Sequence, residues 1–340
     1  MYETQYFPLM HDRALGFFLP PPALLILTPL AFINLNYLPV LYEIILTLAL
    51  FTALFIIVRS LNINYRNQAY IFSYLCLCGF AYEPIRIGQL STILLLGLVC
   101  LLLTLKNNQH IKSGLLLNLF WLKPQLIIPL SFFLLGGRRY QTIIWAGIIA
   151  CLIMLILWLV YPSFDVYVQY KNLINYCIEN SQYMQPELNA TFRGQMLRIL
   201  PHSKTLIMQV SSIIWLICLL AFFIIGHMLR NKEEFVELGV MLIIPAGILT
   251  SLHCYNYDLI FLLPSLLLYF VKWSELDLLA KIIYCLFSTS FLIIFHVYFY
   301  YQYLLKGGII NPYFILLLVF VLTCYKLIYI NKLPLPRLKF

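Results

Sequence analysis

Four short polar stretches interrupt an otherwise apolar chain, and they carry the side chains with which it could bind a ligand. The stretch 252–258 contains His253, Cys254, two tyrosines that include Tyr257, an asparagine and an aspartate, between two apolar runs. A charge at the centre of a membrane helix costs about 2.5–3.5 kcal/mol, so such groups line a cavity or lie at a boundary. Two interpretations follow: a short polar loop with a satisfied histidine, or the polar face of a water-accessible site.

The other three stretches supply cations and amides. Glu83 and Arg86 are three residues apart, so they either form an ion pair on one helix face or contact a ligand together with Gln89. Lys123 is isolated in apolar sequence and is followed directly by Pro124. The fourth stretch contributes Asn189, Arg193 and Arg198.

Fixed cations on one side of a membrane suit a phosphate ligand, and Arg86, Lys123, Arg193, Arg198 and His253 are the candidates here. The sequence contains no Walker loop, GxGxxG, HExxH or GxSxG motif, so nucleotide-driven chemistry has no visible site. Its nine cysteines include no CxxC pair, which argues against a metal site. We therefore expect no cofactor and no metal.

The composition predicts an all-α, polytopic transmembrane bundle. The 340 residues are 63% hydrophobic and only 10% charged, whereas a soluble domain is about a quarter charged. Lipid admits only helices or closed barrels, and these apolar runs do not alternate as barrel strands do. About 11 membrane segments are expected, at 38–58, 69–82, 90–105, 112–122, 125–135, 140–160, 206–228, 237–251, 256–271, 280–300 and 311–330.

The run 112–135 is divided at Lys123, because proline disfavours helix at the preceding residue. With this division, 14 of the 22 basic residues fall in alternate loops and at the C-terminus, which predicts that these face the cytoplasm. The net charge of +9 then reflects basic loops, and no nucleic-acid partner is expected. All four polar stretches share the outer side.

We expect one integral membrane domain over residues 1–340. Residues 1–37 form an extracytoplasmic segment in which Ala23–Ile33, too short to span, lies in the interface. The loop 161–205 is extracytoplasmic and rich in aromatic rings, which suit either a membrane interface or stacking on sugars.

Taken in order, these features resemble glycosyltransferase family 87, the polyprenyl-phosphate-mannose-dependent mannosyltransferases of the GT-C superfamily. The resemblance rests on an aromatic Phe-Leu-Pro-Pro start, Pro84 with Gly88-Gln89, Lys123-Pro124, Asn189-x-Thr-x-x-Gly with Arg198, and His253 with Tyr257. It covers residues 17 to 264 and implies transfer of a sugar, with mannose the expected hexose, from a polyprenyl-phosphate donor to a lipid or glycan acceptor.

In that family the catalytic base is an aspartate in the first outer loop, after a first spanning helix. Only Glu3 and Asp12 precede Pro20 in this sequence, and Asp12 stands closer to the prolines than the resemblance implies. We therefore expect the base to be absent from this sequence, with Asp12 the weak candidate. The start is misassigned, the sequence is a fragment, or it is a non-catalytic relative. The resemblance predicts a parent sequence with one more helix and an aspartate-containing loop upstream of Met1.

The prediction is thus a GT-C hexosyltransferase in the bacterial inner membrane. Its candidate substrate-binding residues are Glu83, Arg86, Gln89, Lys123, Asn189, Arg193, Arg198, His253 and Tyr257. Its expected partners are the polyprenyl-phosphate sugar, the acceptor and membrane lipids. An O-antigen polymerase or ligase, a lipid or solute transporter, and a structural membrane subunit remain as alternatives. A transporter would show matched broken helices in its two halves, and Lys123-Pro124 has no such counterpart.

Overall fold

The computed structural model describes residues 21–22, 32–34, 36–60, 64–160, 167–172, 189–271, 273, 276–290, 292 and 310–326. Within these ranges the chain forms helices and turns, with two isolated bridges, Cys78 to Leu292 and Asn189 to Tyr255, and no strand. The all-helical class predicted from composition is confirmed for the described residues. Residues 23–31 of the expected interfacial segment Ala23–Ile33 lie outside them, as do residues 161–166 and 173–188 of the expected loop 161–205.

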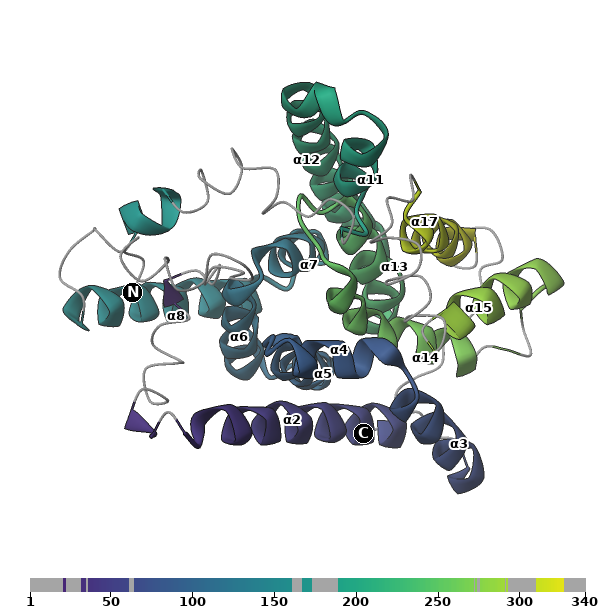
Figure 1. The fold of residues 1–340 in the computed structure, drawn as a ribbon, viewed down its shortest axis with the longest axis horizontal. Coiled ribbons are helices and arrows are strands. Elements are labelled where there is room, and N and C mark those ends of the chain that lie inside the picture. The colour runs from purple at the N-terminus through teal and green to yellow at the C-terminus, as the bar shows by residue number, and fades with distance from the viewer. Residues whose placement is uncertain are drawn as a thin grey trace.

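Figure 1 shows how the described helices are arranged. Their bounds are α2 Leu38–Ser60, α3 Tyr65–Cys76, α4 Gly79–Arg86, α5 Ser91–Lys106, α6 His110–Leu119, the 3₁₀ turn η4 Phe120–Leu122, α7 Pro124–Gly136, α8 Tyr140–Val160, α11 Phe192–Ile199, η6 Pro201–Ser203, α12 Lys204–Leu229, α13 Phe235–Thr250, η7 Asn256–Leu262, α14 Leu263–Val271, α15 Leu278–Ser290 and α17 Pro312–Tyr325.

Among the described residues, three helical stretches are long and apolar enough to cross a membrane: Leu38–Ser60, Tyr140–Val160 and Pro201–Leu229. Six shorter apolar helices accompany them. The expected segment 69–82 is two helices, because α3 ends at Cys76 and α4 begins at Gly79. A membrane protein built of helices is therefore supported, while the count of about 11 segments stays a prediction.

α13 and the segment η7–α14 form the centre of the molecule. Every residue of α13 from Phe235 to Leu249 is buried, and the apolar residues of η7 from Leu259 to Leu262 are at most 1% exposed. A helix that is apolar all round belongs inside a larger assembly. α13 packs against α7, α12, α14 and α17, while η7 packs against α4 and α5. Figure 1 shows α2 and α8 lying at the outside of this central group.

Glycines allow α7 and α12 to approach closely. A Cβ on Gly226 would lie 3.0 Å from the backbone nitrogen of Gly137 and against the carbonyl group of Phe133. A Cβ on Gly136 would meet the backbone of Phe223 in the same way. Small residues at such crossings let helix backbones touch in membranes.

The basic loops that the sequence assigns to the cytoplasm contact one another. Lys106 at the end of α5 forms an ion pair with Glu237 of α13, at 2.7 Å. Arg139 donates to Asn108 at 2.6 Å and lies 5.5 Å from the ring centroid of Phe235. The loops after α5, α7 and α12 therefore gather in one place, as loops on one membrane side should.

Candidate functional site

Lys123 lies at a break between two helices, as the sequence predicts. α6 ends at Leu119, η4 follows, and Lys123 adopts a non-helical conformation with φ −140° and ψ 78° before Pro124 opens α7. Proline suits this first helical position, because the N–H group that it lacks would have no partner within the helix. The break brings the lysine side chain toward η7.

The ammonium group of Lys123 forms an ion pair with Asp258 of η7. It also donates to the hydroxyl of Ser91, the first residue of α5, at 2.8 Å, and that hydroxyl donates to Asp258 Oδ1 at 2.9 Å. The three residues are 7%, 2% and 0% exposed, in the order Lys123, Asp258, Ser91. A buried pair of this kind is costly to break on one side only, at about 3–5 kcal/mol.

Aromatic rings surround the ammonium group and connect it to His253. The Lys123 nitrogen lies 4.8 Å from the ring centroid of Tyr257 and 5.9 Å from that of Phe261. The ring of Tyr257 lies 5.3 Å from Tyr255, whose ring meets His253 edge-on at 4.3 Å. The sequence predicted that Lys123, His253 and Tyr257 belong to one site. In the structure they lie in one group of neighbouring side chains, which we call the cluster.

His253 occupies the connection between α13 and η7. Burial lowers its pKa from 6.5 to about 4, an effect that Asp258 opposes and that Arg193 and Lys123 reinforce. The imidazole is therefore neutral at neutral pH, and these three charged residues lie close enough to act on it.

Arg193 is the second buried cation of this cluster, at 7% exposure. Its Nη1 donates to the carbonyl oxygen of Leu252 at 3.2 Å, its Nη2 contacts the sulfur of Met208, and its Nε has no hydrogen-bond partner. The described residues offer it no carboxylate, in contrast to Lys123. Burial lowers the pKa of Arg193 to about 10, so the group stays charged at neutral pH.

The Asn189-x-Thr-x-x-Gly pattern builds the start of α11 and attaches it to the 252–258 stretch. Thr191 caps the helix by accepting from the backbone N–H of Gly194 at 3.1 Å. Asn189 Oδ1 accepts from the backbone N–H of Thr191 at 3.1 Å and of Cys254 at 3.5 Å. The Ala190 N–H adds a bond to the Cys254 carbonyl at 3.1 Å.

α17 joins the same arrangement through Asn311. Its side-chain amide donates to the Asn189 carbonyl at 3.2 Å, and its backbone N–H donates to Gln195 Oε1 at 2.7 Å. The side-chain oxygen of Asn189 thus binds backbone N–H groups of the protein itself, and the role of Asn189 in binding substrate stays a prediction. The pattern places Arg193 and half-buried Arg198 on α11, beside the cluster.

Glu83 and Arg86 form the ion pair that was one of the two alternatives for this stretch. Arg86 donates twice to the carboxylate, at 2.6 and 3.1 Å, and its side chain is 54% exposed. After α4 the chain turns at Gly88, which has φ +68° and whose carbonyl accepts from Tyr42 at 3.2 Å. Half-buried Gln89 follows, two residues before Ser91. α4 packs on η7, so this stretch borders the cluster without supplying its central cation.

The sequence interpretation missed Asp258 and Ser91 as site residues. The cost that singled out Lys123 in apolar sequence applies equally to the aspartate of the 252–258 stretch, because a buried carboxylate also needs a partner. Pairing the two by that argument would have found Asp258. Ser91 carries no such signal, since serine is common in helices. The weak candidate Asp12 lies outside the described residues.

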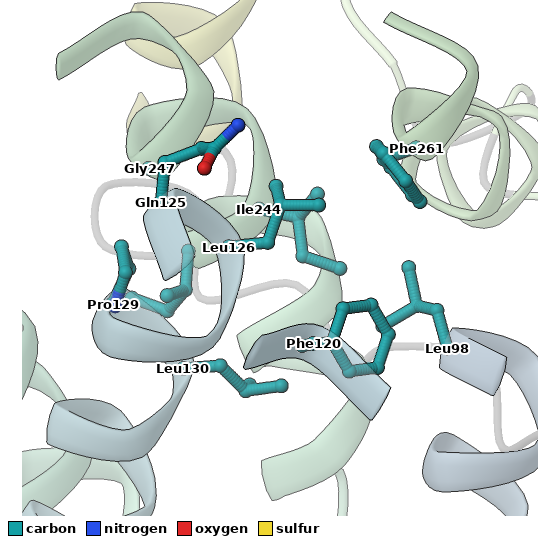
Figure 2. Close-up of a pocket in the computed structure, with 10 residues that line it drawn as sticks. Leu98, Phe120, Gln125, Leu126, Pro129, Leu130, Ile244, Gly247 and Phe261 are labelled. Atoms are coloured by element: carbon teal, nitrogen blue, oxygen red, sulfur yellow. The ribbon is translucent and has the colours of Figure 1, made fainter. Parts of the chain in front are cut away.

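An apolar cavity lies between α5, η4, α7, α13 and η7 (Figure 2). Phe261 lines the cavity and also lies beside the Lys123 ammonium group. Gln125 is the one polar side chain that lines the cavity. Its volume is about 20 Å³, which is room for about one water molecule. It is therefore a packing defect and does not hold a sugar or a lipid chain. Among the described residues, no group of three or more His, Cys, Asp or Glu side chains is arranged to hold a metal ion.

The sequence model of glycosyltransferase family 87 matches residues 17–251, which include Glu83, Lys123, Asn189 and Arg193. No curated protein and no solved structure matches the chain.

Proposed function

The chain belongs to glycosyltransferase family 87 and is therefore a membrane glycosyltransferase, and on this basis we propose its donor, its acceptor and the side on which it works. The donor is a polyprenyl-phosphate hexose, with mannose the expected sugar. The acceptor is a lipid or glycan hydroxyl, and the reaction takes place at the extracytoplasmic face of the bacterial inner membrane. The family match favours this function over the transporter and ligase alternatives.

One observation carries the proposal: a buried cluster whose charges sum to one positive unit. Lys123 and Arg193 are positive, Asp258 is negative, and His253 is neutral at neutral pH. A buried charge is tolerated only when it is balanced. A polyprenyl-phosphate sugar is a phosphodiester with a single negative charge, so it would bring the cluster to neutrality. A nucleotide diphosphate sugar carries two negative charges and would leave the occupied cluster with a net negative charge.

The reaction then follows from charge. The acceptor hydroxyl attacks the anomeric carbon, the bond from that carbon to the phosphate oxygen breaks, and a carboxylate takes the hydroxyl proton. The departing phosphate gains negative charge, and the fixed cations Lys123 and Arg193 stabilise it. His253 contributes a neutral contact beside them. Asp12 remains the weak candidate for the base.

Transfer kinetics test this proposal. The purified full-length protein in lipid nanodiscs should transfer labelled mannose from polyprenyl-phosphate mannose to a lipid acceptor, and should not use GDP-mannose. Lys123→Ala should reduce kcat/KM for the lipid donor at least about tenfold, or about 1.4 kcal/mol of transition-state stabilisation. Gly147→Ala, on a face of α8 where an added Cβ meets nothing, is the control. Unchanged transfer by Lys123→Ala would contradict the proposed role of the cluster.

The membrane orientation needs its own test. We expect His253 and the loop 161–205 outside, and Arg138 and Arg230 inside. Single cysteines at these positions, in a background without native cysteines, should react with a membrane-impermeant maleimide only on the outer set. A labelled position 138 with a protected loop 161–205 would reverse the assignment.

A further inference from the structure

Asp258 is the meeting point of three elements at the centre of the cluster. Its Oδ1 accepts from Lys123 and from the Ser91 hydroxyl, and its Oδ2 lies 3.8 Å from the thiol of Cys254. Ser91 lies 167 positions before it and Lys123 135 positions before it. The carboxylate thus holds the start of α5, the break before α7 and η7 together.

A lysine ammonium must be held by other groups if it is to contact a ligand at a fixed position. Its stem has four carbons and rotates freely, unlike the rigid fork of an arginine. Of its three N–H donors, Asp258 and Ser91 take two, which leaves one for a ligand oxygen. The rings of Tyr257 and Phe261 restrict the group on other sides.

We propose that Asp258 is a positioning residue for the transfer reaction: it fixes the Lys123 ammonium where the donor phosphate arrives, at the expense of donor affinity. The inference rests on the proposed function and goes further by giving the buried carboxylate a part in it. Asp258 does not touch the reacting atoms. It acts through Lys123, with Ser91 as the second fixed contact.

Two opposite electrostatic effects follow, and they separate this role from a merely structural one. The Asp258 charge repels an incoming phosphate, so its removal should leave donor binding as strong as before or stronger. Its removal also frees the ammonium to rotate, so the transition state, in which phosphate charge develops, should be stabilised less well. A damaged fold would instead weaken binding and transfer together.

The experiment compares full-chain variants in nanodiscs with polyprenyl-phosphate mannose as the donor. Asp258→Asn, which keeps the shape and removes the charge, should lower kcat at least about tenfold while the donor KM stays the same or falls. Asp258→Glu should recover part of kcat, because it restores the carboxylate. Glu237→Gln breaks the other buried lysine–carboxylate pair, remote from the cluster, and should leave the KM and kcat of the folded protein unchanged.

A rise in donor KM that parallels the loss of kcat in Asp258→Asn would overturn the proposal, and so would an unchanged kcat. If Asp258→Asn does not fold, Ser91→Ala provides the measurement, because it removes one contact of the ammonium and keeps the ion pair. It should lower kcat several-fold with the donor KM unchanged, and unchanged kinetics would again overturn the proposal.

A thermal-unfolding cycle separates failure of this inference from failure of the proposed function. Asp258→Asn should lower the Tm, and the double variant Lys123→Met with Asp258→Asn should recover part of it, since no uncompensated ammonium remains. Dianionic or lipid-linked phosphate should raise the Tm of Asp258→Asn more than that of the wild type. If the wild type shows no transfer activity, the proposed function is wrong. If neither Tm effect is observed, the positioning role of Asp258 is wrong.

Discussion

Gly194 lies directly against Asn189. A Cβ at position 194 would be 2.5 Å from the carbonyl oxygen of Asn189 and 2.7 Å from its Cγ. The Asn-x-Thr-x-x-Gly pattern is thus a packing unit in which the last residue has no side chain because the first occupies the space. Through this contact the N-terminal turn of α11 stays close to the 252–258 stretch, to which Asn189 and Ala190 are bonded.

The first prediction concerns this contact. Gly194→Ala should destabilise the protein by about 1–3 kcal/mol, the usual cost of overpacking, and should reduce transfer because Arg193 moves with α11. Thermal unfolding in detergent and transfer kinetics measure the two effects.

Gly147→Ala is the matched control. Its Cβ would meet nothing within 4 Å, and alanine is favoured over glycine inside a helix by about 0.8–1 kcal/mol. It should leave stability the same or higher. Equal effects of the two substitutions on the Tm would show that the Asn189–Gly194 contact does not contribute to stability.

The second prediction concerns the crossing of α7 and α12. Gly226→Ala should force the two backbones apart, because its Cβ would meet the carbonyl group of Phe133, with no flexible side chain to give way. We expect a loss of at least about 1–3 kcal/mol and a lower yield of monodisperse protein in size-exclusion chromatography. A variant with the wild-type elution profile and Tm would contradict the crossing.

Sequence reasoning recovered those features that have a strong local cause. The break at Lys123 was predicted because proline disfavours helix at the preceding residue and because a lysine within an apolar run needs a polar neighbourhood, and η4 and α7 confirm it. The helix at 140–160 was predicted at the bounds that α8 has, since this stretch contains no charged residue and is apolar throughout from Ile143 to Val160.

What sequence reasoning missed depends on partners far along the chain. The segment 69–82 reads as apolar, yet it divides at Leu77 and Cys78, where the chain bends so that α4 can pack on η7. Asp258 and Lys123 are 135 positions apart, and no periodicity joins them. Only the cost of burying each charge alone points to the pair.

The third prediction concerns the Lys106–Glu237 pair. Glu237 is 2% exposed at its side chain and Lys106 26%, so Glu237→Gln should cost toward the lower end of about 3–5 kcal/mol. Thermal unfolding measures this loss. The exposed pair Lys326–Asp277 is the matched control, and Asp277→Asn should change the Tm much less, because solvent screens an exposed ion pair. Equal losses would show that burial of the first pair is not what matters.

The fourth prediction concerns pH and His253. Its folded-state pKa, about 4, lies below the 6.5 of an exposed histidine, because burial disfavours the charged imidazolium and Arg193 and Lys123 add to that effect while Asp258 opposes it. The unfolded chain therefore takes up a proton on this residue at a higher pH than the folded protein. Titration of His253 costs no stability above pH 6.5, and the folded protein is destabilised as the pH falls from 6.5 toward 4, by about 3 kcal/mol at most.

Unfolding of the wild type and of His253→Gln should be followed between pH 7.5 and 4.5 in detergent. Glutamine does not titrate in this range, so the variant should lose less stability than the wild type as the pH is lowered, and the difference should open below pH 6.5. His202→Gln replaces an exposed histidine in η6 and should follow the wild type. If His253→Gln and the wild type lose stability in parallel, the imidazole at position 253 is not held neutral by its surroundings.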